Sequence, residues 1–150
     1  MSDRSTNHAT FVIERTYDAA PARVWRAWSE PEQKLRWFGP RDLEKPDHEL
    51  DFRVGGHERI AVRTPDGALY TFLSRYHDII ENERFVHTYE MYRNEARISV
   101  SVATIELESA GAGTKLTITE QGVFLDALDT PEAREHGTRE LLETLAEALV

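Results

Sequence analysis

The stretch from Thr130 to Val150 constrains the fold more than any other part of this sequence. Thr130 is a favourable N-cap, and Pro131 suits the first helical position, where no backbone hydrogen is needed. Apolar or small side chains then recur at spacings of three and four, at Thr138, Leu141, Leu142, Leu145 and Leu149. This periodicity predicts a long helix with one apolar stripe, which must pack against another element to be stable.

Most of the remaining chain has the pattern of β-strands. The β-branched and aromatic residues from Thr10 to Tyr17 predict a first strand, and Pro21 begins a pair of short helices that ends near Trp37. From Glu49 onward apolar and polar residues alternate, which predicts six mostly meandering strands. An antiparallel meander buries one face, and only the C-terminal helix is large enough to cover it. The predicted fold class is therefore α+β.

The alternation changes phase in one of these strands. Ile98, Val100 and Val102 fall in one phase, whereas Ile105 and Leu107 fall in the other. Because a strand keeps one face toward the core, this change predicts a β-bulge in the Ala103–Thr104 region.

Length and charge narrow the class of protein. A chain of 150 residues with 40% hydrophobic content is expected to form one domain over residues 8–150, after a flexible N-terminus at residues 1–7.

A net charge of −9 opposes nucleic-acid binding. No apolar run is long enough for membrane insertion and no signal peptide is evident, so we expect a cytoplasmic protein. A homodimer is compatible with the sequence.

Several short motifs occur in an order that resembles the SRPBCC, or START-like, superfamily. Within that superfamily, the chain resembles the branch named after the activator of the heat-shock protein 90 ATPase. The matching pieces are Ala19-Ala20-Pro21, Val24-Trp25, Pro31, Trp37-Phe38, Val54-Gly55-Gly56, Tyr76-His77-Asp78-Ile79, the run from Gly113 to Glu120 and the leucine-rich C-terminal helix. One residue departs from the pattern, since Thr138 follows the helix glycine Gly137 where that branch usually has tryptophan.

This resemblance implies a helix-grip fold, in which a curved antiparallel sheet wraps around the C-terminal helix and often encloses a cavity. It implies no single activity. Relatives bind lipids, polyketides, hormones or other apolar ligands, some cyclise or hydrate such molecules, and the eukaryotic namesake docks on a chaperone. The match of Gly137 to the family glycine implies close packing of the helix against the sheet at that position.

The candidate ligand site is the aromatic surface that faces the long helix. Its residues are Phe52, Tyr70, Phe72, Tyr76, Phe85, His87, Tyr89 and Met91, with Trp28, Trp37 and His136 at its wall or entrance. Ligand pockets combine apolar walls with a few orienting polar groups, which the tyrosines and His87 supply here. A filled sheet-helix core needs the same residues, so both interpretations stay open at this stage.

Two glutamates fall in the inward phase of their strands. Glu58 precedes Ile60, and Glu120 follows Ile118 at strand spacing. A buried carboxyl is either paired or neutral, so Glu120 and His87 are the candidate catalytic residues of a cyclase- or dehydratase-like enzyme that works without metal. The alternative is that these glutamates reach solvent or pair with an arginine such as Arg75 or Arg97.

The sequence contains no motif for a metal or cofactor. The histidine spacings match no zinc-binding helix, cysteine is absent, and no nucleotide-binding glycine loop is found. We therefore expect no cofactor, and a binding protein rather than an enzyme. The first hypothesis is an apolar small molecule as the partner, and the second is a chaperone partner.

Overall fold

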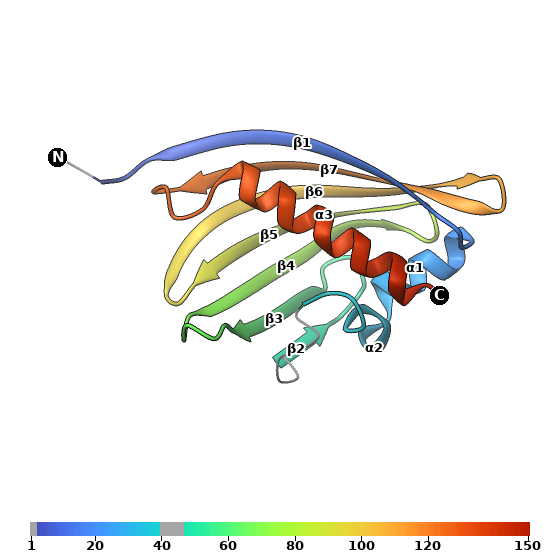
Figure 1. Ribbon diagram of the computed structural model, residues 1–150, viewed down its shortest axis with the longest axis horizontal. Coiled ribbons are helices and arrows are strands. Elements are labelled where there is room, and N and C mark those ends of the chain that lie inside the picture. Colours follow the sequence, from blue (N-terminus) through green and yellow to red (C-terminus); the bar gives the residue numbers. More distant parts are fainter. Residues whose placement is uncertain (1–2, 40–46) are drawn as a thin grey trace.

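The computed structural model describes residues 3–39 and 47–150 of the chain (Figure 1). Its elements are β1 (Thr6–Tyr17), α1 (Pro21–Ser29), α2 (Pro31–Lys34), β2 (Asp47–Leu50), β3 (His57–Arg63), β4 (Leu69–Ile80), β5 (Arg84–Arg93), β6 (Ala96–Ala110), β7 (Gly113–Leu125) and α3 (Pro131–Ala148). Because β1 begins at Thr6, Thr6 and Asn7 belong to the sheet and not to the flexible terminus expected at residues 1–7. Residues 1–2 lie outside the described range.

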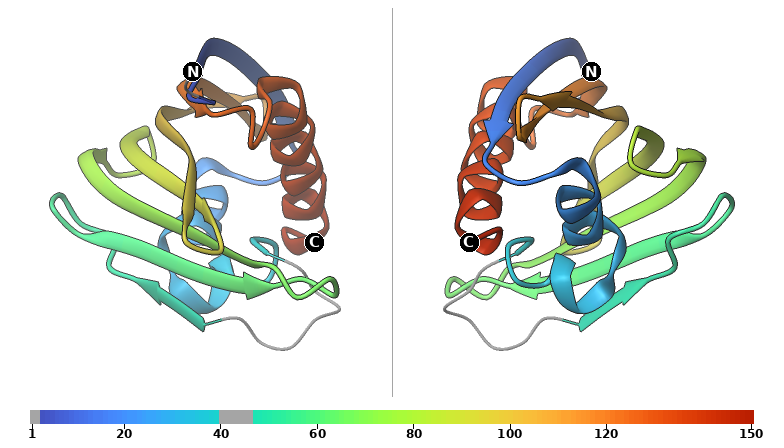
Figure 2. Two further views of the ribbon diagram at one scale, coloured as in Figure 1. Left: turned by 90° about the vertical axis from the view of Figure 1, so that its left-hand side faces the viewer. Right: turned by 90° about the vertical axis from the view of Figure 1, so that its right-hand side faces the viewer.

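The strands form one antiparallel sheet in the order β1-β7-β6-β5-β4-β3-β2. β2 to β7 follow the chain as a meander, and β1 returns to pair with β7 along its whole length. Figure 2 shows that the sheet is strongly curved and that α3 lies along its concave side, with α1 and α2 closing one end. The helix-grip α+β fold predicted from the sequence is confirmed.

Polar contacts fix α3 in this position. Thr130 caps the helix by accepting a hydrogen bond from the backbone nitrogen of Ala133 at 3.1 Å, as predicted for an N-cap. The Tyr17 hydroxyl on β1 donates to the backbone oxygen of Leu142 at 2.9 Å. Arg23 on α1 donates to the backbone oxygen of Ala148 at 3.1 Å. The C-terminal half of α3 is thereby tied to both β1 and α1.

The apolar core is divided into two clusters. The larger cluster joins α1, the sheet and the C-terminal half of α3, where Leu142 and Leu145 are fully buried. The smaller cluster contains Ile60, Phe72 and Tyr89 on β3, β4 and β5. The helix therefore packs on the larger cluster, and the smaller one lies farther toward the β2 edge of the sheet.

The β-bulge predicted in the Ala103–Thr104 region is wrong. β6 pairs with β7 without a register shift from Ser99 to Ala110, and the shift lies instead in the pairing with β5, where Met91 pairs with Ser99 and Tyr92 with Arg97, so that Ile98 of β6 is the extra residue. Val100 and Val102 face outward on this continuous strand, and the small side chains of Ser99 and Ser101 face inward. The interior therefore receives hydroxyl groups at positions where apolar alternation predicted valines.

Close packing around Gly137 is also not found. A Cβ atom placed on Gly137 meets no heavy atom within 4 Å, so open space lies next to this turn of α3. Gly56 is the opposite case, because a Cβ atom there lies 2.2 Å from the backbone oxygen of Asp51. The helix glycine is therefore not required by steric contact with the sheet.

These two glycines give a test of the packing. Gly137→Ala is expected to raise the free energy of unfolding by roughly 0.5–1 kcal/mol, because alanine has the higher helix propensity and nothing obstructs its methyl group. Gly56→Ala is expected to destabilise the protein through its backbone clash. Urea unfolding of both variants measures the difference, and a destabilised Gly137→Ala protein contradicts the open geometry.

Candidate functional site

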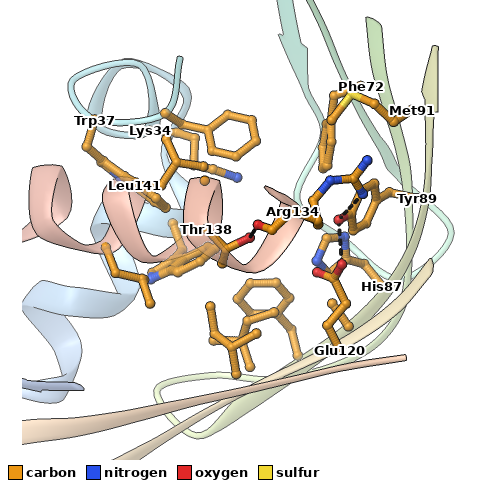
Figure 3. A pocket seen from close by; sticks show the side chains of 18 of the residues that line it. Lys34, Trp37, Phe72, His87, Tyr89, Met91, Glu120, Arg134, Thr138 and Leu141 are labelled. Atoms are coloured by element: carbon orange, nitrogen blue, oxygen red, sulfur yellow. Dashed lines mark hydrogen bonds between the residues drawn. The ribbon is translucent and has the colours of Figure 1, made fainter. Parts of the chain in front are cut away.

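A cavity of about 270 Å³ lies between the N-terminal half of α3 and the concave face of the sheet (Figure 3). Its wall is formed by Trp28, Lys34, Trp37, Phe38, Phe72, Tyr76, Phe85, His87, Tyr89, Met91, Ala103, Ile105, Ile118, Glu120, Asp129, Ala133, Arg134, Gly137, Thr138, Leu141 and Leu142. These residues come from both core clusters, so the cavity is bordered by the two clusters together. Most of the wall is apolar and aromatic, with charged groups at two places.

The first charged group is centred on Arg134, which projects from the first turns of α3. Its guanidinium donates to the hydroxyl of Tyr89 at 2.9 Å and to Ser99 Oγ at 2.8 Å, and it contacts Asp129 Oδ2 at 2.9 Å. The Tyr89 hydroxyl in turn donates to Glu120 Oε2 at 2.8 Å. Figure 3 shows Arg134, Tyr89 and Glu120 together at one side of the cavity. We call these five residues the arginine cluster.

Burial determines the protonation chemistry of this cluster. Desolvation raises the pKa of Glu120, although the Tyr89 hydroxyl and the Arg134 charge act in the opposite direction. Desolvation and the neighbouring Glu120 also raise the pKa of Tyr89. Its hydroxyl therefore stays protonated and acts as a hydrogen-bond donor. The pKa of Arg134 is raised even though burial lowers it, because Tyr89 and the carboxylates favour its charged form. The cluster is thus a permanent cation next to a carboxyl that resists ionisation.

The second charged group is centred on Glu58 of β3, whose side chain is completely buried. Lys34 Nζ of α2 lies 2.7 Å from Glu58 Oε1, and His48 Nε2 of β2 lies 2.8 Å from Oε2. The Tyr76 hydroxyl of β4 donates to Oε1 at 3.2 Å. This network, which we call the lysine network, joins α2 to three neighbouring strands.

The pKa of Glu58 in the lysine network is shifted in the opposite direction to the pKa of Glu120. Burial acts to raise the pKa of Glu58, but the Lys34 ammonium and the hydrogen bonds from His48 and Lys34 outweigh it and lower this pKa to about 2. Glu58 is therefore ionised over the whole physiological range. The Lys34 ammonium also lies 4.3 Å from the ring centroid of Phe38 and 5.3 Å from that of Trp28, within the range of cation–π attraction.

His87 lies among aromatic rings between these two charged groups. Its Nδ1 is 2.8 Å from Ser74 Oγ, and its ring stacks on Tyr89 with centroids 5.7 Å apart. Desolvation first, and the Lys34 charge second, lower the pKa of His87 to about 3. The imidazole is therefore neutral near pH 7 and presents a polar, uncharged edge in an apolar wall.

Most of the sequence-predicted site residues line the cavity. They are Trp28, Trp37, Phe72, Tyr76, Phe85, His87, Tyr89, Met91 and Glu120. Three others do not. Phe52 packs edge-on against Trp25 behind the wall, and Tyr70 accepts a hydrogen bond from Arg93 near the end of β4. The side chain of His136 is 74% exposed and contacts Glu140 at 2.9 Å on the outer side of α3.

Sequence reasoning missed the two cations of the site. Arg134 falls at position i−4 from Thr138, so the inward stripe of α3 extends one turn earlier through a charged residue. Lys34 belongs to no periodic pattern in the sequence, because α2 is a single helical turn. Glu58 and Glu120 point inward as predicted, but neither forms its contact with Arg75 or Arg97 as the alternative proposed. Arg97 pairs with Glu90 at 2.9 Å.

Comparison with known proteins assigns the family. Residues 18–150 match the family described as activator of Hsp90 ATPase homolog 1-like protein. The chain belongs to this family. A comparison with curated proteins gives no match.

Solved structures agree with the family and with the fold. An uncharacterised protein from Rhizobium leguminosarum is 46% identical, with a TM-score of 0.94 and coverage of 97% of both chains. A protein from Rhizobium loti is 40% identical, with a TM-score of 0.89 and coverage of 96% of this chain and 99% of the other. A more distant structure, from Chromobacterium violaceum, is 26% identical with a TM-score of 0.79, covering 93% of this chain and 96% of the other. Their descriptions name no ligand or activity.

The described ranges are residues 3–39 and 47–150. Within these ranges, no three histidine, aspartate or glutamate side chains are grouped so that they could hold a metal ion. Among the helices described, none combines the length and apolar composition that a membrane span requires.

The two buried glutamates are expected to give opposite pH dependences of stability. The lowered pKa of Glu58 contributes stability that is present above its ordinary value of 4.5 and is lost as pH falls toward about 2. Glu58→Gln is therefore expected to cost about 3–5 kcal/mol at neutral pH, because Lys34 loses its partner, and the difference from wild type should shrink in acid.

For Glu120, the expected change of stability with pH has the opposite sign. Its raised pKa contributes stability that is present below 4.5 and is lost as pH rises through the folded-state value. Relative to wild type, Glu120→Gln should therefore gain stability as pH rises from 4.5 to neutrality. Urea unfolding of the wild type and both variants across this pH range measures both trends. Parallel pH profiles for the two variants contradict the assigned charge states.

Proposed function

We propose that this protein binds a small, mainly apolar aromatic molecule in the cavity between α3 and the sheet. The observation that carries the proposal is the cavity itself, which is walled by aromatic side chains and flanked by buried charged groups. Apolar walls with a few fixed polar groups are typical of small-molecule sites. The proposal extends the family assignment, which names no ligand for this chain.

The cavity volume limits the size of the ligand. At about 270 Å³ it lies just below the ~300–1,000 Å³ that drug-sized ligands occupy. The same space would hold roughly nine water molecules, each of which needs at least two polar partners. Most of the wall offers none, so an apolar molecule of about two fused rings is a better occupant than water.

The helix side of the cavity supports binding over simple packing. Gly137 and Thr138 line it with little side-chain volume, and a methyl group on Gly137 still meets no atom within 4 Å. A helix face that served packing alone usually carries larger side chains against the sheet, because unfilled space forfeits dispersion contacts. The space next to Gly137 is therefore consistent with a site for another molecule.

The other two hypotheses receive less support from the geometry. An enzyme needs an acid or base with a pKa near its working pH, and the pKa of His87 is lowered to about 3. Glu120 has one oxygen engaged by Tyr89, although its raised pKa makes it the better candidate for a general acid, because it keeps its proton to higher pH than an ordinary glutamate. A chaperone-binding role follows only from the name of the family.

Filling the cavity from the helix tests this function. Isopropylnaphthalene, an uncharged two-ring probe, is expected to bind the wild type and to raise its unfolding temperature by mass action. Gly137→Leu should abolish this binding because its side chain extends into the open space, while the fold stays stable because leucine is a good helix former. Isothermal titration calorimetry gives the affinity, and binding should carry a negative heat-capacity change.

Gly137→Ala is the matched control, since its methyl group leaves most of the cavity free and binding should survive. If the wild type fails to bind the probe, or if Gly137→Leu binds it as well as wild type, the cavity is not the binding site for apolar aromatic molecules.

A further inference from the structure

We infer that Lys34 is the anchor for an oxygen acceptor on the bound molecule, so that the ligand is an aromatic compound carrying a carbonyl or carboxylate group. This inference rests on the proposed binding function and adds the chemical class of the ligand. It follows from a comparison of how many hydrogen-bond partners the protein provides for each buried cation of the cavity.

Lys34 is incompletely satisfied. Its side chain is 3% exposed, and an ammonium group has three N–H donors. Among the residues that the structure describes, its only hydrogen bond is to Glu58 Oε1, at 2.7 Å. Two donors of this buried cation therefore have no acceptor among residues 3–39 and 47–150, which is unusual for a charged group removed from water.

Aromatic rings surround the rest of the ammonium group. The ring centroids of Phe38, Trp28 and Trp37 lie 4.3, 5.3 and 5.7 Å from Lys34 Nζ. Their faces attract a cation, but they do not replace a directional hydrogen-bond acceptor. These rings also line the cavity, so a flat molecule lying among them would meet the free donors of Lys34 with its edge.

Arg134 is the contrasting case. Its guanidinium already makes three bonds to Tyr89, Ser99 and Asp129, all between 2.8 and 2.9 Å. The Tyr89 hydroxyl accepts one hydrogen bond from Arg134 and donates one to Glu120. Both terminal nitrogens of Arg134 therefore have protein partners, with two of its five N–H donors left over, whereas the Lys34 ammonium has a single partner among the described residues.

The positions of the two groups give the ligand a direction. Figure 3 shows the Lys34 ammonium reaching into the cavity from the α2 side, with Arg134, Tyr89 and Glu120 on the other side. An oxygen acceptor at Lys34 leaves the apolar part of the ligand against Phe72, Tyr89 and Met91. The neutral edge of His87 lies between the two ends.

Because Glu58 is ionised, either a carbonyl oxygen or a carboxylate can be accommodated next to Lys34. The pair of Lys34 and Glu58 is neutral as a whole, so a carbonyl oxygen adds no charge to the cavity. A carboxylate adds one negative charge, which Lys34 meets directly as a charge-assisted hydrogen bond. The shared chemistry is an oxygen that accepts from Lys34, and the choice of probes separates the two sources.

Three probes of nearly equal shape test the inference. Isopropylnaphthalene, acetylnaphthalene and naphthoate carry the substituent at the same ring position and differ in whether it accepts hydrogen bonds. Titration calorimetry with the wild type is expected to give roughly tenfold or greater tightening for the ketone, for naphthoate or for both, relative to the hydrocarbon, because a hydrogen bond to a charged donor is gained. Tightening for naphthoate alone identifies a carboxylate ligand.

The variant must remove Lys34 without leaving an unpaired buried charge. Lys34→Met alone strands Glu58, so the test uses Lys34→Met together with Glu58→Gln, a neutral replacement of similar volume that keeps partners for His48 and Tyr76. The matched control is Lys115→Met with Glu14→Gln, which removes an exposed pair 3.5 Å apart on the outer side of the sheet. Circular dichroism and urea unfolding establish that both double variants are folded.

Each outcome decides the matter. Loss of the acceptor preference in the Lys34 double variant, with hydrocarbon binding retained and the control like wild type, supports the inference. Equal binding of the three probes by the wild type overturns it and leaves the proposed function intact, as does an acceptor preference that persists in the Lys34 double variant. Binding of none of the probes overturns the proposed function and this inference with it.

Discussion

The uneven packing of α3 is the constraint on which the rest of the structure depends. Its C-terminal half is buried through Leu142 and Leu145 and is tied to β1 by the Tyr17 hydroxyl. Its N-terminal half contacts the sheet through the long side chain of Arg134, with Gly137 in the turn between. The cavity lies between this half of the helix and the concave face of the sheet.

The sequence was sufficient for the architecture because repetitive patterns determine it. Alternating strands and one amphipathic helix leave few arrangements, and the N-cap at Thr130 was correct to the residue. The phase of β6 was predicted wrongly because Val100 and Val102 are apolar yet face solvent, whereas Ser99 and Ser101 are small and face inward. Hydrophobicity alone does not reveal that an interior position must accommodate a guanidinium.

The aromatic residues that form the wall of the candidate site were predictable from the sequence, but the pairings of its charged side chains were not. Aromatic residues two apart on a strand share a face, so Phe85, His87 and Tyr89 were found together. The partners of Glu58 and Glu120 are Lys34 and Tyr89, which lie 24 and 31 residues away along the chain. Such pairings follow from tertiary geometry that no local pattern encodes. For the same reason, one buried glutamate has a lowered pKa and the other a raised one, although both were predicted to point inward.

Several features around the cavity work against the stability of the chain. Gly137 lowers helix propensity by roughly 1 kcal/mol relative to alanine, at a position where alanine meets no obstruction. A buried ion pair such as that of Lys34 and Glu58 is often no more stabilising than apolar residues of similar volume. Each feature alone has an explanation in local structure. Both features lie at the wall of one cavity between helix and sheet, which is where the proposed ligand would occupy space that side chains leave open.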